Sequence, residues 1–297
     1  MTHYLTLIGA PGKLTPKHAA AAAGLVERPG EARWLSPEEA VDIPFAPDPD
    51  RDPAGLEETL RGAFAGEPID LAIVPAAHRR KKLLVADMDS TMIRQECIDE
   101  IADFAGLRGH IAAITERAMR GEIEFAPALR ERVGLLKGLD ESVLQRVFDE
   151  RVELMPGGRE LVMTMRAHGA LAVLVSGGFT FFTARVAERT GFDVNRANIL
   201  EVAEGKLTGA AREPILGREA KLEALEHFRK QRGLAVEDTL AVGDGANDLA
   251  MIEAAGLGVA YHAKPVVAAC ARARVDHGDL TALLYLQGYA REEFSAG

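Results

Sequence analysis

The sequence has few cysteines and no long apolar run, and each shortage excludes a class of protein. Its 297 residues include two cysteines, Cys97 and Cys270, too few for a disulfide scaffold and without C-x-x-C spacing. We therefore expect reduced thiols in a cytoplasmic protein. No apolar stretch approaches the roughly 18 residues that span a bilayer, and the N-terminus has no basic leader, so no membrane partner is expected.

Positive charge is also scarce. Thirty-five lysines and arginines stand against 45 aspartates and glutamates, a formal net charge of −10. Because affinity for a phosphate backbone depends on lysine and arginine, we expect no nucleic-acid partner. A hydrophobic content of 47% and a charged content of 27% are ordinary for a globular protein. The length allows one large domain or two unequal ones.

The first 80 residues predict a small α+β N-terminal domain. A Pro- and Asp-rich stretch, residues 43–55, is expected to interrupt regular structure. The basic run "HRRKK", residues 78–82, is typical of a solvated linker and marks the predicted boundary. The elements expected here are strands at Leu5–Ile8, Ala32–Leu35 and Leu71–Val74, and helices at Pro16–Val26 and Leu56–Phe64.

From Lys81 onward, short Val- and Leu-rich runs alternate with helical segments, which predicts a parallel sheet covered on both faces. The residues from about 93 to 154 break this alternation, because they hold amphipathic helical segments and no strand. We therefore expect a Rossmann-like α/β core, residues 81–92 and 155–297, with a helical cap inserted after the first core strand. The predicted core strands are Leu83–Ala86, Leu171–Val175, Thr239–Val242 and Leu257–Ala260, and Ile199–Gly209 is a predicted hairpin.

Polar residues follow three of the predicted strands. Asp87 and Asp89 come after the first strand, "SGGFT" (176–180) after the second and "GDGAND" (243–248) after the third. Ligands of parallel sheets bind beyond these carboxyl ends. Carboxylates that converge there at about 4 Å would repel by roughly 4 kcal/mol per pair at an effective dielectric near 20. A hard divalent cation, Mg²⁺ by preference, removes that cost through oxygen ligands.

The second strand end predicts an anion site. Ser176, Gly177 and Gly178 are expected to open the next helix, where backbone N–H groups approach a ligand closely. Lys221, near the start of a later helix, supplies a cation, so the set fits a phosphoryl group. Taken singly, D-x-D and S-G-G are typical of solvated turns. "GDGAND" is not an EF-hand, since the twelfth position from Asp244 is Ala255 instead of glutamate.

"DMDST", "SGGF", Lys221 and "GDGANDLAM" together resemble the four motifs of the haloacid dehalogenase-like phosphatases. Within that superfamily the cap segments "ECIDEIADFAG", "ITERAMRGEIEF" and "LRERVGLLKGL" are similar to those of the phosphoserine phosphatases. The resemblance runs from about Leu83 to Leu284. It implies a haloacid dehalogenase-like core and Mg²⁺-dependent hydrolysis of O-phospho-L-serine, the last step of L-serine biosynthesis.

The resemblance assigns the chemistry to the strand ends. It implies that Asp87 is the nucleophile, which forms an aspartyl-phosphate. Asp89 is then the general acid that protonates the leaving oxygen and the base that activates water. Mg²⁺ would be held by Asp87, the main-chain oxygen of Asp89 and Asp244, with Asp248 in support. The phosphoryl oxygens would be held by Ser176, Gly177, Lys221 and Asn247.

The resemblance assigns substrate choice to the cap. Glu96 matches the position that meets the substrate ammonium, and Arg132 the position that clamps its carboxylate, a task that suits the paired donors of a guanidinium. Met119 and Phe125 match apolar positions that close over the substrate. Two alternatives remain open: a related phosphatase or phosphotransferase acting on phosphohomoserine or phosphothreonine, and a non-catalytic amino-acid sensor.

The N-terminal segment resembles a reduced ACT domain, a small regulatory domain that often binds amino acids. Its strand and helix order fits loosely, with the Pro- and Asp-rich stretch interrupting the middle. Serine binding there and a structural or dimerising role are both open, and a homodimer through this segment is one expectation.

Overall fold

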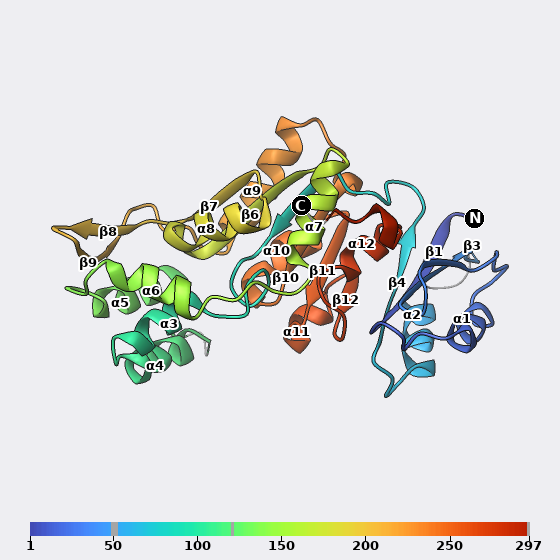
Figure 1. Cartoon of the computed structure of the whole chain (residues 1–297), viewed down its shortest axis with the longest axis horizontal. Helices are drawn as coiled ribbons and strands as arrows, with labels where there is room; N and C mark the ends of the chain where they lie inside the picture. The colour runs from blue at the N-terminus through green and yellow to red at the C-terminus, as the bar shows by residue number, and fades with distance from the viewer. Residues whose placement is uncertain (49–52, 120–121, 296–297) are drawn as a thin grey trace.

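The computed structural model describes residues 1–48, 53–119 and 122–295. Its larger sheet is six-stranded and parallel, in the order β12-β11-β10-β5-β6-β7, and lies in the middle of the molecule (Figure 1). The α/β prediction is therefore confirmed. The strands are β5 (Leu83–Ala86), β6 (Leu171–Phe179), β7 (Val194–Asn198), β10 (Thr239–Gly243), β11 (Leu257–Tyr261) and β12 (Ala273–Val275).

Helices cover both faces of this sheet. Successive residues of a strand point to opposite faces, so each face contributes to its own buried cluster. Leu84 and Ala86 of β5 join one buried apolar cluster, and Leu83 and Val85 join another. The first cluster includes residues of α7 (Gly158–Ala167), α8 (Thr180–Thr190) and α12 (Ala282–Leu286). The second includes residues of α9 (Glu219–Gln231), α10 (Leu249–Ala254) and α11 (Pro265–Ala268).

Four helices form the cap between β5 and α7: α3 (Cys97–Phe104), α4 (Arg108–Met119), α5 (Phe125–Leu135) and α6 (Ser142–Glu150). The two chain segments that join cap and core are paired. An antiparallel bridge joins Ile93 to Leu154, and the Arg94 N–H donates to the Glu153 carbonyl at 3.0 Å. The Gln95 side chain accepts from the Glu153 N–H at 2.9 Å. The side chain of Gln95 therefore has a structural role in the pairing of the two segments.

The predicted hairpin is present as β8 (Leu200–Ala203) and β9 (Lys206–Ala211). It lies within the core segment of the sequence, but its backbone forms hydrogen bonds with the cap. The Gly138 N–H donates to Leu207 and the Leu207 N–H to Leu139. Gly209 packs so closely that a β-carbon there would lie 2.8 Å from Cβ of Lys137, at a φ of +83°. The hairpin is thus a second connection between cap and core (Figure 1).

The N-terminal residues form a four-stranded antiparallel sheet in the order β2-β3-β1-β4, with α1 and α2 packed on one face. The order β-α-β-β-α-β is that of a ferredoxin-like unit. The division of the chain near residue 80 stays a prediction. The elements are β1 (His3–Gly9), α1 (Pro16–Ala23), β2 (Arg33–Ser36), β3 (Ala40–Phe45), α2 (Pro53–Ala63) and β4 (Ile69–Pro75).

Strand β3 corrects the prediction that residues 43–55 lack regular structure. Residues 49–52 of this stretch lie outside the described residues. Pro44 sits within β3, opposite Tyr4 of β1. Its carbonyl accepts from the Gly30 N–H at 2.7 Å, on the side away from β1. Since the nitrogen and carbonyl of one strand residue face the same side, Pro44 removes no hydrogen bond from the β1 ladder.

The prediction of a solvated run fits His78, Arg80 and Lys82, whose side chains are 47%, 44% and 57% exposed, but not Arg79 and Lys81. Arg79, with a side chain 10% exposed, makes a bidentate ion pair with Asp42 of β3 at 2.6 and 2.7 Å. It also donates to Thr6 of β1 and to the carbonyl of Leu286, the last residue of α12. Lys81 is buried as well and donates to the Glu237 carbonyl at 2.7 Å. Burial lowers the pKa of Lys81 to about 8. The prediction was wrong for these two cations because their partners are far away in sequence.

Within the described parts of the chain, no helix combines the length and the apolar character that crossing a bilayer requires.

Replacing Arg79 by leucine should lower the free energy of unfolding by about 3–5 kcal/mol, because the buried Asp42 carboxylate loses its partner. Arg80→Leu is the matched control, since its ion pair with Glu293 is 44% and 29% exposed and such pairs contribute about 1 kcal/mol or less. Urea unfolding of both variants measures the difference. Equal losses would show that the buried pair has no special weight.

Candidate active site

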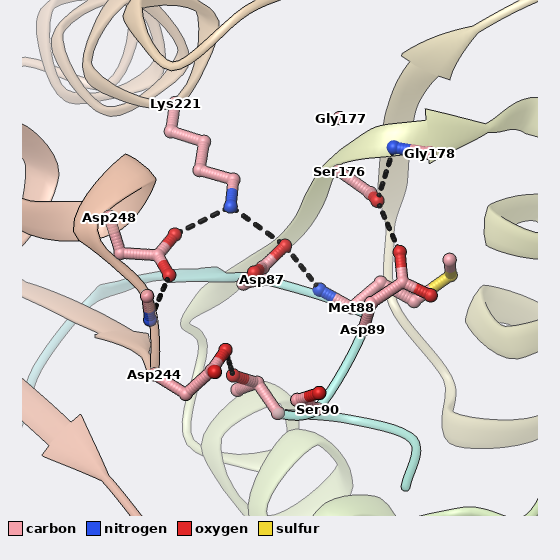
Figure 2. A network of polar contacts seen from close by, with 12 residues as sticks. Asp87, Met88, Asp89, Ser90, Ser176, Gly177, Gly178, Lys221, Asp244 and Asp248 are labelled. Atoms are coloured by element: carbon pink, nitrogen blue, oxygen red, sulfur yellow. Dashed lines mark hydrogen bonds and ion pairs between the residues drawn. The ribbon is translucent and has the colours of Figure 1, made fainter. Parts of the chain in front are cut away.

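The polar groups predicted at the strand ends lie together at the carboxyl edge of the sheet (Figure 2). Asp87 and Asp89 follow β5, Ser176 lies in β6 and Asp244 follows β10. The strands β10, β5 and β6 are neighbours in the sheet, so their ends meet. Asp248 ends a short 3-10 helix (Ala246–Asp248) and is fully buried.

Lys221, on the first turn of α9, joins two of these carboxylates. Its Nζ lies 2.8 Å from Oδ1 of Asp87 and 2.5 Å from Oδ1 of Asp248. The lysine is 2% exposed. Burial alone would lower its pKa, but the two carboxylates outweigh burial and raise it above the usual value. The ammonium therefore stays charged and holds the nucleophile candidate in place.

One lysine does not balance the acidic groups. Carboxylate oxygens of Asp87, Asp244 and Asp248 all lie within 4.8 Å of one another. Burial raises the pKa of Asp87 well above its usual value, and the Asp248 carboxylate raises it further although Lys221 opposes this. Burial and Asp248 also raise the pKa of Asp244. Hard oxygen donors with excess negative charge fit a divalent cation such as Mg²⁺.

Asp89 has different surroundings from Asp87. Its Oδ1 accepts from the Cys97 N–H at 3.0 Å, and its Oδ2 from the Ser176 hydroxyl at 3.1 Å. Burial raises the pKa of this carboxyl, against the effect of those hydrogen bonds. Figure 2 shows Asp89 turned toward Ser176, whereas Asp87 meets Lys221. A raised pKa suits a group that donates a proton and later accepts one.

The "SGG" segment continues strand β6, which corrects the prediction that it opens the helix; α8 begins at Thr180. The Gly178 N–H donates to Ser176 Oγ at 2.8 Å. A β-carbon on Gly177 would lie 2.9 Å from Cζ of Phe125 on the cap. Cap and core therefore touch where the glycine leaves space for an aromatic ring.

A cavity of about 670 Å³ lies between core and cap. Lys221 and Asp248 are not among its lining residues, but Lys221 contacts the lining residue Asp87. Met119 ends α4, and its side chain lies outside the described residues. The predicted site residues that line the cavity are Asp87, Asp89, Glu96, Phe125, Arg132, Ser176, Gly177, Asp244 and Asn247.

The cap end of the cavity carries charges of both signs. The Glu96 carboxylate accepts from the Ser90 hydroxyl at 2.7 Å. Glu96 reaches solvent through the cavity, yet the surrounding protein and the Asp89 carboxylate raise its pKa to about 7. Arg132 donates to the Ala128 carbonyl at 3.3 Å and to Thr115 Oγ1 at 3.5 Å. Among the described residues no carboxylate forms an ion pair with Arg132.

Three polar lining residues were missed from the sequence: Asp99, Thr115 and Lys264. Thr115 lies four residues after buried Ile111 in α4, so a polar residue on an apolar helix face was the signal for it. Lys264 follows β11, so its place after the carboxyl end of a predicted core strand was the signal for it. Asp99 lies one helical turn after Glu96, on the same face of α3.

The haloacid dehalogenase-like hydrolase family model matches residues 84–253. A phosphoserine phosphatase of Streptomyces coelicolor is 45% identical over 250 residues, which cover 82% of this chain and 61% of that protein. A solved structure of a probable phosphoserine phosphatase from Vibrio cholerae has a TM-score of 0.77 at 34% identity, covering 98% of this chain and 88% of that one.

A solved phospho-aspartyl intermediate analogue of phosphoserine phosphatase has a TM-score of 0.64 at 40% identity, covering 69% of this chain and 98% of that chain. By comparison, the chain spans about three-fifths of the length of the Streptomyces relative. Both the acidic strand ends and the cap lie within the matched segment. The chain belongs to the haloacid dehalogenase-like hydrolases.

Proposed function

We propose that this chain is a phosphoserine phosphatase, which hydrolyses O-phospho-L-serine to L-serine and phosphate in the cytoplasm as the last step of L-serine biosynthesis. One observation carries the proposal. A single cavity is lined by Asp87 and Asp89 on the core and by Glu96 and Arg132 on the cap. Phosphoserine carries a phosphate, an ammonium and a carboxylate, and each of these groups has a partner there.

Asp87 attacks phosphorus in line. Its carboxylate oxygen forms the new bond to phosphorus while the bond from phosphorus to the seryl oxygen breaks. Asp89 gives its proton to that leaving oxygen, and serine departs. Asp89 then takes a proton from water, whose oxygen forms a bond to phosphorus while the bond from phosphorus to the Asp87 oxygen breaks, so phosphate leaves and the Asp87 carboxylate is restored. The hydrogen bonds from Cys97 and Ser176 to Asp89 support this assignment because they fix its orientation.

Lys221, the Ser176 hydroxyl, the Gly177 N–H and Asn247 bind the phosphoryl oxygens and stabilise their charge in the transition state. Asp87, the Asp89 main-chain oxygen and Asp244 would hold Mg²⁺, with Asp248 in support. The ion, when bound, offsets the repulsion between the Asp87 carboxylate and a phosphate dianion. Asp248 also accepts from the Gly245 N–H at 3.0 Å, which fixes the loop after β10.

Substrate choice is proposed to come from the cap. Arg132 clamps the substrate carboxylate, Glu96 binds the ammonium, and Phe125 and Met119 exclude water from the reacting groups. Arg132 is suited to this task because no protein carboxylate already occupies its guanidinium among the described residues.

Residues 1–80 are proposed to be a structural or dimerising unit. Its sheet ends in β2 on one side, and in the described chain no further strand pairs with the outer edge of β2. A second copy could pair there and form a homodimer.

Asp87→Asn should lower phosphate release from O-phospho-L-serine by at least about a thousandfold, because the nucleophile is lost. EDTA should abolish release by the wild type, and added Mg²⁺ should restore it. Asp149→Asn, an exposed change on cap helix α6, is the control and should be neutral. Metal-dependent release that survives in Asp87→Asn would contradict the assignment.

Arg132→Lys should reduce kcat/KM for O-phospho-L-serine about ten- to a hundredfold, since lysine cannot form the bidentate contact. The rate on phosphoethanolamine, which lacks the carboxylate, should be low in the wild type and nearly unchanged in the variant. Arg130→Lys, an exposed arginine of the same helix, is the matched control. Equal wild-type rates on the two esters would leave only a general phosphatase.

Glu96 should make substrate binding depend on pH near 7. Because its pKa is raised to about 7, the carboxyl is neutral below that pH and loses its attraction for the ammonium. We expect KM for O-phospho-L-serine to rise as pH falls from 8 to 6, and to change less in Glu96→Gln. The substrate's own phosphate titrates equally in both enzymes, so their ratio isolates Glu96. A constant ratio would refute its role.

A further inference from the structure

Thr115, on cap helix α4, has a side chain whose position the reaction chemistry does not explain. We propose that Thr115 is a specificity residue, which positions the Arg132 guanidinium and donates its own hydroxyl hydrogen to the substrate carboxylate. The inference rests on the proposed function and deepens it, because it adds a second donor to the part of the site that selects phosphoserine.

The contacts of Arg132 make Thr115 its positioning partner. Arg132 Nε is tied to its own helix through the Ala128 carbonyl at 3.3 Å. Its NH1 reaches across to Thr115 Oγ1 on α4 at 3.5 Å. A guanidinium has five N–H donors, and these two contacts leave most of them for a ligand. Both side chains line the cavity, so the pair presents donors toward the same space.

The hydroxyl hydrogen of Thr115 is available. A threonine within a helix often donates to the carbonyl four residues earlier, and two threonines of this chain do so. Thr59 donates to Gly55 at 2.8 Å, and Thr190 to Val186 at 2.6 Å. Among the described residues, Thr115 makes no such bond, and its hydroxyl only accepts a hydrogen bond from Arg132. An acceptor in the cavity would complete its hydrogen bonding.

The local charge explains why a second donor matters. Glu96 and Asp99 also line the cavity. Burial lowers the pKa of Arg132, and both carboxylates counter this effect by attracting its charge. They suit the substrate ammonium but repel its carboxylate. A carboxylate offers about four acceptor positions, which one partly engaged guanidinium does not fill. A neutral hydroxyl supplies a donor there without attracting Glu96 or Asp99 as a further cation would.

The experiment compares Thr115→Val, Thr115→Ser and wild type on O-phospho-L-serine and on phosphoethanolamine. Valine keeps the shape and the branched β-carbon but has no hydroxyl. We expect Thr115→Val to raise KM for phosphoserine about tenfold or more, with a smaller change in kcat, as for loss of a hydrogen bond to a charged group. Phosphoethanolamine kinetics should be unchanged, and Thr115→Ser should recover most of the loss.

Each other result decides the question. If the wild type prefers phosphoserine and Thr115→Val keeps that preference, the inference is wrong while the proposed function stands. An equal loss on both esters would mean that Thr115 only supports the cap fold. If the wild type releases no phosphate, the proposed function fails, and calorimetric titration with O-phospho-L-serine and phosphoethanolamine still tests Thr115. Wild type should then bind phosphoserine more tightly, and Thr115→Val should lose that difference; equal binding overturns the inference.

Discussion

The contact on which the site depends is that of one buried ammonium with two buried carboxylates. The Lys221 ammonium contacts both Asp87 and Asp248, and all three side chains are almost inaccessible to water. Such charges are costly to bury unless each is paired and hydrogen-bonded. The arrangement satisfies the lysine and leaves the acidic cluster with more negative than positive charge. That imbalance, together with the nearby N–H and hydroxyl donors, is what makes the edge of the sheet a place for a cation and a phosphoryl group.

The position of the cap over the core is fixed at two places. The paired linkers hold one end through the bridge between Ile93 and Leu154. The β8–β9 hairpin holds the other through backbone bonds to residues 138–141. Between these connections the Phe125 ring lies against Gly177. The separation between the acidic groups at the core and Glu96 and Arg132 on the cap is therefore set by backbone structure. In the proposed function, this separation lets one cavity bind both ends of a small substrate.

Local patterns predicted the parts of the fold that depend on local sequence. The run Leu83–Ala86 is apolar throughout because both faces of β5 are covered, and the strand has those bounds. The acidic residues after it were also found from local sequence, because carboxylates beside a buried strand are costly unless a site requires them. The strands β7 and β12 were missed because these edge strands carry polar residues, such as Asn195 and Arg274, and therefore lack a continuous apolar run. Arg79 was misjudged because its partners come from distant segments, which no local pattern contains. For Thr115 a local signal existed, its polar side chain on an apolar helix face, but its contact with Arg132 on another helix could not be read from that signal.

Other long-range contacts connect the N-terminal sheet to the segments that join cap and core. Asp70 of β4 is buried and accepts from the N–H groups of Asp276, His277 and Gly278. This loop runs on to Leu280, whose N–H donates to Pro156, next to Met155, which in turn bonds to Met92 beside β5. Hydrogen bonds therefore run from the N-terminal sheet to the residues at which the cap leaves the core. A carboxylate that accepts from three backbone donors favours one conformation of its loop. The N-terminal unit is thus bonded to the core at this loop, while none of its described residues lines the cavity.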